Sequence, residues 1–434
     1  MAAESIKIGL LGCGTVGSGV VKVILENQSH IAQRLGKELT IKRVLELDAS
    51  KVTVLGLDES IVTRDIEDLV ADPEIKLVVE VMGGIEPART FVLEALNHGK
   101  SVVTANKDLI ALHGRELLET AQAKGLDFYF EASVGGGIPI IAPLKQSLAA
   151  NQIQKIIGIV NGTTNYILTK MSQEGRDYQE VLEEAKALGY AEADPTSDVE
   201  GYDAARKIAI LASIAFGSRT TFPDVYVEGI TRITPVDIEH GKELGYALKL
   251  LAIANEVDGE IDVRVHPAFI PLKHPLAAVN DVFNAIFIRG DFVGDIMHYG
   301  RGAGQRPTAS AVVGDIMEVA RNLEYGSVGR ISCTCFEHKP IKPISEIMSR
   351  YYIRMLVKDR PGVLAGIAGV FGNQQVSLGS VIQKRNVGNL AELVLVTHRV
   401  QEGSLQDALK ILGGMSIIGS ISNVIRVEEE EAEA

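Results

Sequence analysis

The 434-residue sequence has few cysteines and no long apolar stretch, and each absence excludes a class of protein. Three cysteines, at positions 13, 333 and 335, make neither the disulfide framework of a small secreted domain nor the spacing of a zinc site. Cys333 and Cys335 are too close to pair readily if that segment is an extended strand. No apolar run approaches the ~20 residues of a membrane span. The first strand is expected by residue 5, which leaves no room for a signal peptide. We therefore expect a cytoplasmic protein.

Positive charge is also scarce relative to negative charge, and the formal net charge is −13. Nucleic acids and anionic membranes are bound by basic faces, so neither is an expected partner. Hydrophobic residues make up 46% and charged residues 23% of the chain, as in globular proteins with sizeable cores. The length predicts roughly two to four domains.

An apolar strand at 5–11 runs directly into a glycine-rich turn, GCGTVG at 12–17, and a helical pattern follows. In this context the first glycine permits the tight turn, the second lets a pyrophosphate approach the backbone, and the third allows close helix packing. The new helix offers free N–H groups to the phosphate. We expect these residues to contact a dinucleotide: Gly12, Gly14, Thr15, Val16 and Gly17. Without that context, the same glycines would form only a flexible turn.

The end of the second expected strand, 41–48, decides between NAD and NADP. An acidic residue there accepts the ribose hydroxyls of NAD, whereas an arginine accommodates the extra phosphate of NADP. Glu46 and Asp48 flank Leu47 here, and Lys51 is the only cation close by in sequence. The spacing from the glycines exceeds the usual ~20 residues, so the first helix must be long or followed by a loop. We expect Asp48 at the adenine ribose and favour NAD.

Strands and helices then alternate, which predicts an α/β fold with a Rossmann-type doubly wound parallel sheet. The expected elements are a helix at 65–71, a strand at 76–82, a helix at 87–98, a strand at 101–107, a helix to 124 and a strand at 127–133. Residues 1–135 would form this dinucleotide-binding domain, with 304–325 returning to it. Ligands bind beyond the carboxyl ends of such strands. Segments 83–84, 106–107 and 131–139 lie at those ends.

The remaining chain predicts two further domains. Residues 136–303 have the mixed pattern of an α+β substrate-binding and dimerisation domain, with a strand at 153–160, a polar turn opening a helix at 161–168, helices at 178–188 and 200–216, and strands within 246–299. Residues 323–349 contain Pro340 and Pro343 and predict a linker. Residues 350–427 have the βαββαβ pattern of a small ferredoxin-like domain. The acidic tail, 428–434, is expected to be disordered.

One further stretch, DVEGYDAARKIAILA at 198–212, gathers charge at the start of an apolar helix. Asp203 and Lys207 are four residues apart and share a helix face. Asp198 lies one turn earlier, and Glu192 comes shortly before it. Alone, such a pattern is more often a solvated first turn with an ordinary ion pair. The motifs in the rest of the chain favour a functional site.

Six motifs follow one another in a single order: GLLGCGTVG, VVTANKDLIA, EASVGGGIPI, NGTTNYIL, GYAEADPTSDVEGYDAARK and GRGAGQRPTASAVVGDI. From about residue 5 to 325 the chain resembles homoserine dehydrogenase. Residues 350–427, with DRPGVLA at 359–365, resemble an ACT domain, a regulatory module that binds amino acids. Together they resemble the monofunctional bacterial enzyme with a C-terminal ACT extension, and no aspartate-kinase segment is expected. The resemblance implies reversible NAD(P)H-dependent reduction of L-aspartate 4-semialdehyde to L-homoserine in threonine and methionine biosynthesis.

The resemblance also implies roles for individual residues. Lys207 would be the general acid in reduction and the base in oxidation, and Lys107 would lie between cofactor and substrate and help to polarise the aldehyde. Since a free lysine has a pKa of ~10.4, we expect Lys207 to be partly desolvated or flanked by a cation. Glu192 and Asp203 would hold the substrate ammonium, and Asp198 would support the site. Positions implied near the cofactor or in the same cleft are Gly189, Gly304, Lys107 and Thr163.

A structural monovalent cation, usually sodium, is implied in the loop at 131–139. Its ligands would be the carboxylate of Glu131 and the carbonyls of Val134, Gly136 and Ile138. Hard oxygen ligands and a glycine-rich loop suit such an ion, although the same residues would also make an ordinary turn. The resemblance further implies a homodimer built through the second domain's sheet, and threonine as the ACT effector, with the linker carrying the regulatory signal.

Two alternatives remain at this point. A nucleotide- or amino-acid-binding sensor would need neither Lys107 nor Lys207. Aspartate-semialdehyde dehydrogenase needs a nucleophilic cysteine, and the cysteines here lie in the glycine turn or after residue 330. Many homoserine dehydrogenases carry an arginine at the position of Leu47, and its absence here favours NAD over NADP.

Overall fold

The computed structural model describes residues 5–429, and the chain divides into two compact units. Unit 1 comprises Met1–Ile156, Arg206–Asp224 and Asn284–His338, and unit 2 comprises Ile157–Ala205, Val225–Phe283 and Lys339–Ala434. Three elements pass from one unit into the other: β7 (Ile153–Ile159), α10 (Tyr202–Ala215) and β11 (Phe283–Gly290). Within the described range, no helix has both the length and the hydropathy to cross a membrane.

Unit 1 contains a six-stranded parallel sheet in the order β3-β2-β1-β4-β5-β6. The strands are β1 (Ser5–Leu11), β2 (Glu38–Leu45), β3 (Val62–Thr63), β4 (Ile75–Glu80), β5 (Ser101–Thr104) and β6 (Phe128–Tyr129). The strand order reverses between β1 and β4, and such a switch point is where doubly wound sheets bind ligands. The predicted α/β fold is confirmed.

The helices of this sheet account for the long spacing after the glycine turn. They are α1 (Thr15–Glu26), α2 (Gln28–Leu35), α3 (Ser50–Thr53), α4 (Glu67–Val70), α5 (Ala88–Asn97) and α6 (Lys107–Ala123). The extra residues form α2, a second helix rather than a loop. Consequently β2 runs from Glu38 to Leu45, three residues earlier than predicted at each end.

The predicted strand at 127–133 is shorter than expected. Only Phe128 and Tyr129 pair with β5, and Glu131–Ser133 form the single turn η2. Glu131 accepts hydrogen bonds from backbone N–H groups further along the chain, so the segment turns away from the sheet.

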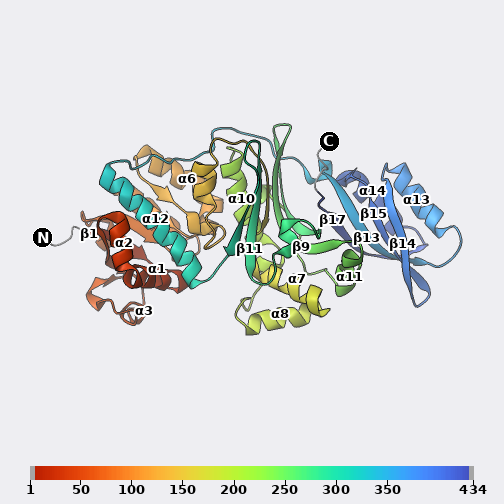
Figure 1. Cartoon of the computed structure of the whole chain (residues 1–434), viewed down its shortest axis with the longest axis horizontal. Coiled ribbons are helices and arrows are strands. Elements are labelled where there is room, and N and C mark those ends of the chain that lie inside the picture. The colour runs from red at the N-terminus through yellow and green to blue at the C-terminus, as the bar shows by residue number, and fades with distance from the viewer. Residues whose placement is uncertain (1–4, 430–434) are drawn as a thin grey trace. The chain divides into compact units, whose positions relative to one another are not determined.

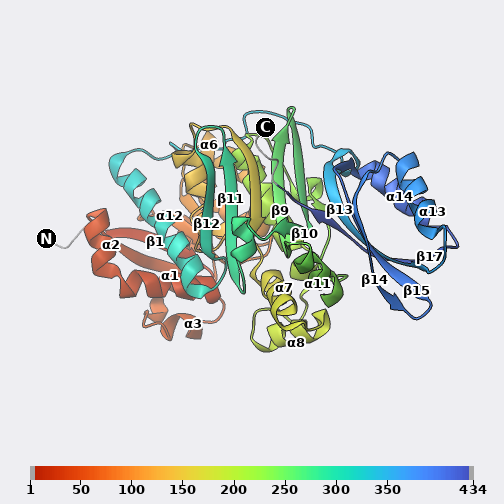
Figure 2. The same ribbon diagram turned by 45° about the vertical axis from the view of Figure 1, so that its right-hand side comes forward.

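The helix α12 (Gln305–Tyr325) lies along α1 although some 280 residues separate them, as both ribbon views show (Figures 1 and 2). The Gln305 side chain donates to Ser18 Oγ at 2.9 Å. Six buried residues of α12 join the apolar core that contains β1 and α1: Ala309, Val312, Val313, Ile316, Val319 and Ala320. Also in unit 1, β12 (Gly294–Arg301) is the neighbour of β11, which lies beside β7.

Unit 2 combines a long antiparallel hairpin with several helices. The hairpin strands β9 (Tyr246–Val257) and β10 (Glu260–Pro271) pair along their whole length. The other elements before residue 339 are α7 (Gly162–Glu174), α8 (Tyr178–Ala187), α9 (Thr196–Val199), β8 (Tyr226–Val227) and α11 (Pro235–Glu243).

The C-terminal part of unit 2 has the predicted βαββαβ topology. Its elements are β13 (Met348–Lys358), α13 (Val363–Asn373), β14 (Leu378–Val387), β15 (Leu390–Thr397), the short β16 (Val400–Gln401), α14 (Glu402–Gly413) and β17 (Ile418–Val427). The strand order is β17-β13-β15-β14, and α13 and α14 contribute to one apolar core with it. Strand β17 also pairs in parallel with β10, so one sheet runs through both parts of unit 2 (Figure 2).

Buried ion pairs accompany this strand pairing. Arg354 of β13 donates to Asp237 of α11 at 2.6 Å and to Glu392 of β15 at 3.4 Å. Arg426 of β17 contacts both Glu228 and Glu402 at 2.9 Å. Each buried carboxylate therefore has a cationic partner, which offsets part of its desolvation.

The segment predicted to be a linker and the start of the tail predicted to be disordered both make hydrogen bonds to the rest of the chain. In unit 1, Glu337 N donates to Gly217 O at 2.9 Å, and in unit 2 Lys342 N donates to Ile261 O at 2.8 Å. The expected linker at 323–349 is thus largely held by the units it joins. Glu428 N donates to Phe269 O at 2.8 Å, and the Glu428 carboxylate pairs with Arg264. Disorder is thus wrong for the start of the acidic tail, and residues 430–434 lie outside the described range.

Candidate functional site

The glycine turn lies between β1 and α1, at the switch point of the parallel sheet. A Cβ built on Gly17 would lie 2.1 Å from Gly12 O, so only glycine permits this close packing. A Cβ on Gly14 would meet no atom within 4 Å. Gly14 is the N-cap of α1, and no side chain caps this helix among the described residues. The first-turn N–H groups, at Thr15, Val16 and Gly17, are therefore directed to an open site that suits a phosphate.

Glu46, at the end of β2, binds back to this turn. Its carboxylate accepts a hydrogen bond from Cys13 N at 2.9 Å and pairs with Lys51 Nζ at 3.2 Å. Burial alone would raise the pKa of Glu46, but the Cys13 and Asp48 backbone N–H groups and Lys51 hold it below its usual value. Asp48 lies further out, and its carboxylate accepts from Ser50 Oγ at 2.6 Å.

An arginine that sequence spacing did not reveal lies at the same strand end. Arg64 Nη2 donates to Leu47 O at 2.9 Å, and its side chain is exposed. The contact is made across 17 residues, between the ends of β2 and β3, so only the parallel pairing of these strands brings it there. A second cation besides Lys51 therefore lies at the end of β2.

The ends of β4 and β5 are joined by a buried polar network. Thr104 Oγ1 donates to Glu80 at 2.6 Å, and Met82 N donates to the same carboxylate at 2.9 Å. Asn106 Nδ2 donates to Gly84 O at 2.6 Å, while its Oδ1 caps α6 by accepting from Leu109 N at 3.1 Å. Burial raises the pKa of Glu80. This network holds the two loops that precede Lys107, the first residue of α6.

Lys107 is the first residue of α6, and Lys207 lies in the second turn of α10; both lysines belong to unit 1. Lys107 is half-buried, and Lys207 is 9% exposed. Their chain neighbours Asp108 and Arg206 form an ion pair at 2.8 Å. Arg206 also lies over the Phe222 ring, 4.9 Å from its centroid. The pair ties the start of α6 to α10, so the two lysines are anchored by one contact that the sequence did not predict.

In unit 2, a single amide holds two of the predicted carboxylates. Asn161 Nδ2 donates to Asp198 at 2.7 Å and to Asp203 at 2.9 Å, and its Oδ1 caps α7 by accepting from Thr164 N at 2.9 Å. Asp203 is 6% exposed. The sequence predicted a polar turn opening a helix at 161–168 but did not single out Asn161, although an N-cap asparagine is a recognisable signal. The arrangement places two carboxylates side by side, as a binding site for an ammonium group requires.

The other predicted positions in unit 2 lie close along the chain. Thr163 Oγ1 donates to Tyr190 O at 2.7 Å, which ties the start of α7 to the segment that carries Glu192. Gly189 has φ +73° just after α8, and Glu192 is exposed. In unit 1, Gly304 is the N-cap of α12 with φ +116°.

The loop at 131–139 has a buried carboxylate with backbone partners. Glu131 accepts from Ile140 N, Ile141 N and Ala142 N at 2.5, 2.8 and 2.7 Å. These three backbone hydrogen bonds give both oxygens of the Glu131 carboxylate a partner without a cation. Gly135 and Gly136 have φ values of +73° and +54°. Among the described residues, no cluster of three or more His, Cys, Asp or Glu side chains could hold a metal. A cation here would depend on carbonyl oxygens.

Three family models match the chain. The homoserine dehydrogenase model matches residues 139–317, the homoserine dehydrogenase NAD binding domain matches 12–131, and the ACT domain matches 351–414. The chain is 45% identical to the homoserine dehydrogenase of Bacillus subtilis, over 98% of this chain and 99% of that protein.

Solved structures agree with these matches. A crystal structure of a homoserine dehydrogenase from Thiobacillus denitrificans has a TM-score of 0.93 and 41% identity, and the match covers 98% of this chain and 99% of that one. A hyperthermophilic archaeal homoserine dehydrogenase in complex with NADPH has a TM-score of 0.62 and 30% identity, over 73% of this chain and 98% of that one.

The glycine turn makes a direct prediction. Because a Cβ on Gly14 meets no protein atom, Gly14→Ala should fold normally but weaken binding of the reduced dinucleotide at least ~10-fold, since the methyl group occupies the phosphate's approach. Gly17→Ala should lower the melting temperature, because its Cβ collides with Gly12 O. Fluorescence titration and thermal melting measure the two effects. The control is Gly314→Ala on α12, where a Cβ is also unopposed. Unchanged dinucleotide affinity in Gly14→Ala would contradict the site.

Proposed function

The chain belongs to the homoserine dehydrogenase family, and from this premise we propose that it catalyses the reversible reduction of L-aspartate 4-semialdehyde to L-homoserine. The observation that carries the proposal for this chain is the geometry of α10. Asp203, held by Asn161, and the buried Lys207 lie one helical turn apart on this helix. Side chains at such positions have Cβ atoms about 5–6 Å apart, a spacing that suits the two ends of a four-carbon amino acid.

The proposed chemistry divides between these residues. A bound nicotinamide supplies the hydride in reduction and accepts it in oxidation. The Lys207 ammonium donates a proton to the carbonyl oxygen in reduction, and the neutral amine takes it back in oxidation. Lys107 stabilises the negative charge that develops on that oxygen. Asp203 and Glu192 bind the substrate ammonium, and Asp198 keeps Asp203 in place through their shared amide donor.

Replacement of the proton donor tests this assignment. Lys207→Ala should lower kcat for homoserine oxidation by roughly 100-fold or more, the usual scale of general acid–base catalysis. Dinucleotide affinity should stay within about twofold, because no cofactor contact is removed. Glu192→Ala should instead act mainly on the KM for homoserine.

Lys170→Ala is the matched control. Lys170 pairs with Glu174 on the surface of α7, and its loss should leave both constants within about twofold. A Lys207→Ala enzyme that keeps more than half of the wild-type turnover would exclude Lys207 as the proton donor.

For the cofactor, we propose that both NAD and NADP are used. Asp48 favours the ribose hydroxyls of NAD, whereas Lys51 and Arg64 at the same strand end can bind a 2′-phosphate. The proposed contacts of the dinucleotide also include Gly189, Gly304 and Lys107.

Arg64 should therefore control cofactor choice. Arg64→Ala should lower kcat/KM with NADP about 10-fold, the size of one charge-assisted contact, and leave the value with NAD within about twofold. Leu47→Arg should raise kcat/KM with NADP. Arg43→Ala is the control, because Arg43 also donates to a backbone carbonyl, that of Ser60, but does not lie at the strand end. Equal losses with both cofactors in Arg64→Ala would contradict the proposed role.

A monovalent cation in the loop at 131–139 is proposed as a structural element. Its oxygen ligands would be Glu131 and the carbonyls of Val134, Gly136 and Ile138, and the positive φ values of the glycines support a tight turn of this kind. The bonds that Glu131 already makes limit the ion to a secondary role.

We also propose a homodimer and a cytoplasmic location. Three large side chains of the β11–β12 hairpin are exposed, Phe292 at 87%, Met297 at 40% and Tyr299 at 54%. A group of exposed apolar side chains on an edge hairpin supports an interface in which a second copy of this chain covers them. The three unpaired cysteines suit a reducing compartment.

Feedback regulation by threonine at the ACT domain is proposed as a property of the full chain. Threonine inhibits only if it binds the inactive state more tightly than the active one. Since β17 pairs with β10 and Arg354 binds Asp237, the signal has a direct route besides the segment at 323–349. Removal of the ACT domain would expose β10 and leave Asp237 unpaired, so point variants make a better test.

Arg354→Met should raise the threonine concentration for half-inhibition at least ~10-fold, because it removes the ion pair between α11 and β13. It should also cost about 3 kcal/mol of unfolding free energy, since a buried carboxylate loses its partner. Arg385→Met is the matched control, because Arg385 pairs with Glu392, as Arg354 does, but from an exposed position. Its loss should lower the unfolding free energy by less than ~1 kcal/mol. Inhibition by threonine at the wild-type concentration in Arg354→Met would exclude this route.

A further inference from the structure

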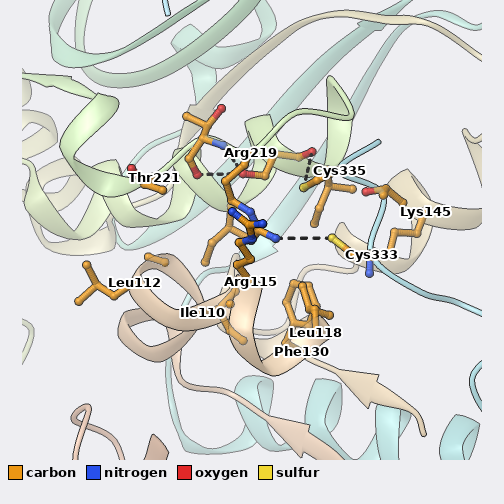
Figure 3. Close-up of a pocket in the computed structure, with 17 residues that line it drawn as sticks. Ile110, Leu112, Arg115, Leu118, Phe130, Lys145, Arg219, Thr221, Cys333 and Cys335 are labelled. Carbon is orange, nitrogen blue, oxygen red and sulfur yellow. Dashed lines mark hydrogen bonds between the residues drawn. The ribbon is translucent and has the colours of Figure 1, made fainter. Parts of the chain in front are cut away.

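A cavity of about 270 Å³ lies in unit 1 between α6 and α10, and we call it the α6–α10 cavity (Figure 3). From α6 it is lined by Ile110, Ala111 and Gly114, and from α10 by Ile210, Ser213 and Ile214. These positions follow Lys107 and Lys207 by three to seven residues, so they continue along the helix faces that carry the two lysines. The cavity is separate from the residues proposed to bind substrate.

Two thiols and three cationic side chains line this cavity: Cys333, Cys335, Arg115, Lys145 and Arg219. Arg219 Nη2 donates to Cys333 Sγ at 3.6 Å, and Cys335 Sγ contacts Ser213 O at 3.7 Å (Figure 3). Both cysteines are partly exposed.

The chain is irregular around the two cysteines, within the segment predicted to be a linker. Residues 333–335 form no strand, and Phe336 N donates to Thr334 O at 3.0 Å, so the chain bends. Both thiols line the same α6–α10 cavity.

The surrounding charges make the two thiols unequal. The interaction with Cys335 and the positive charges of Arg219 and Lys145 hold the pKa of the Cys333 thiol below its ordinary value, against the effect of burial. The interaction with Cys333 and burial raise the pKa of Cys335. Arg115 pairs with Glu119 at 2.7 Å. The contacts agree with this inequality, because Arg219 donates to Cys333 Sγ, as it would to a thiolate, whereas Cys335 Sγ donates its proton to Ser213 O.

We propose that Cys333 and Cys335 form a reactive dithiol site for small hydroperoxides, with Cys333 as the attacking sulfur and Cys335 as the resolving sulfur. The α6–α10 cavity has room for such a reagent beside Cys333, since a water molecule occupies about 30 Å³ in the liquid. Cys13 is the contrast within the same chain, because it is buried in the glycine turn and burial raises its pKa.

Hydrogen peroxide would oxidise the two thiols to a disulfide in two steps. The Cys333 thiolate attacks one oxygen of hydrogen peroxide, the O–O bond breaks, and hydroxide leaves as the sulfenic acid forms. Cys335 then attacks the Cys333 sulfur, the S–O bond breaks, and the thiol proton leaves with the oxygen as water. Two thiol sulfurs lose two electrons, which reduce the peroxide. A dithiol reductant returns both thiols by exchange.

The test uses the reduced full-length enzyme, hydrogen peroxide and mass spectrometry. Both cysteines lie in one tryptic peptide, 331–350, because prolines follow Lys339 and Lys342. In wild type this peptide should lose two hydrogen atoms and regain them with dithiothreitol. Cys335→Ser should stop at a sulfenic acid that dimedone captures, whereas Cys333→Ser should oxidise at least ~10-fold more slowly. An over-oxidised sulfinic acid, or a bridge between two chains, in the wild type would overturn the proposal.

Alkylation by iodoacetamide tests the cause of the reactivity. Cys333 should react at a nearly constant rate between about pH 8 and pH 6, because its lowered pKa keeps it a thiolate over this range. An ordinary thiol slows roughly tenfold per pH unit below its pKa. Arg219→Gln should shift the Cys333 profile to higher pH, and Arg115→Gln, the matched control, should not. A Cys333 profile that falls like an ordinary thiol in the wild type would overturn the assignment.

Discussion

Buried carboxylates that accept backbone N–H groups hold the loops at the carboxyl edge of the parallel sheet. Glu46 binds the glycine turn through Cys13 N, Glu80 binds the loop after β4 through Met82 N, and Glu131 binds the start of the segment after the glycine loop. A charged carboxylate removed from water is costly unless hydrogen bonds replace the water. Each acid is thus stable only while its loop keeps one conformation, and the loops around the proposed cofactor depend on these contacts.

The proposed catalytic groups are positioned by residues that take no part in the chemistry. Asn161 orients Asp198 and Asp203, and the pair Asp108–Arg206 ties the start of α6 to α10, the two helices that carry Lys107 and Lys207. Proton transfer and charge stabilisation require fixed geometry, and short polar contacts between these elements provide it. The same helices line the α6–α10 cavity, which the two cysteines also line.

In unit 2, the ACT domain shares a sheet with the part of the chain that precedes it. The parallel pairing of β10 with β17 and the buried contacts of Arg354 and Arg426 join these two parts directly. A ligand that changes the ACT strands would act directly on α11 and β10. Regulation through a shared sheet differs physically from regulation through a linker, because strand registry transmits small displacements.

Local patterns in the sequence determined the parallel sheet, the ferredoxin-like topology, the glycine turn at 12–17 and the spacing of Asp203 and Lys207. Each depends on residues close in the chain, where helical or strand periodicity acts directly. Sequence alone did not identify Arg64 beside Leu47, Asn161 between two acids, Arg206 on Asp108, or Arg219 on Cys333. These contacts join segments distant in sequence. Only the tertiary structure decides them, because strand pairing and helix packing determine which distant side chains meet.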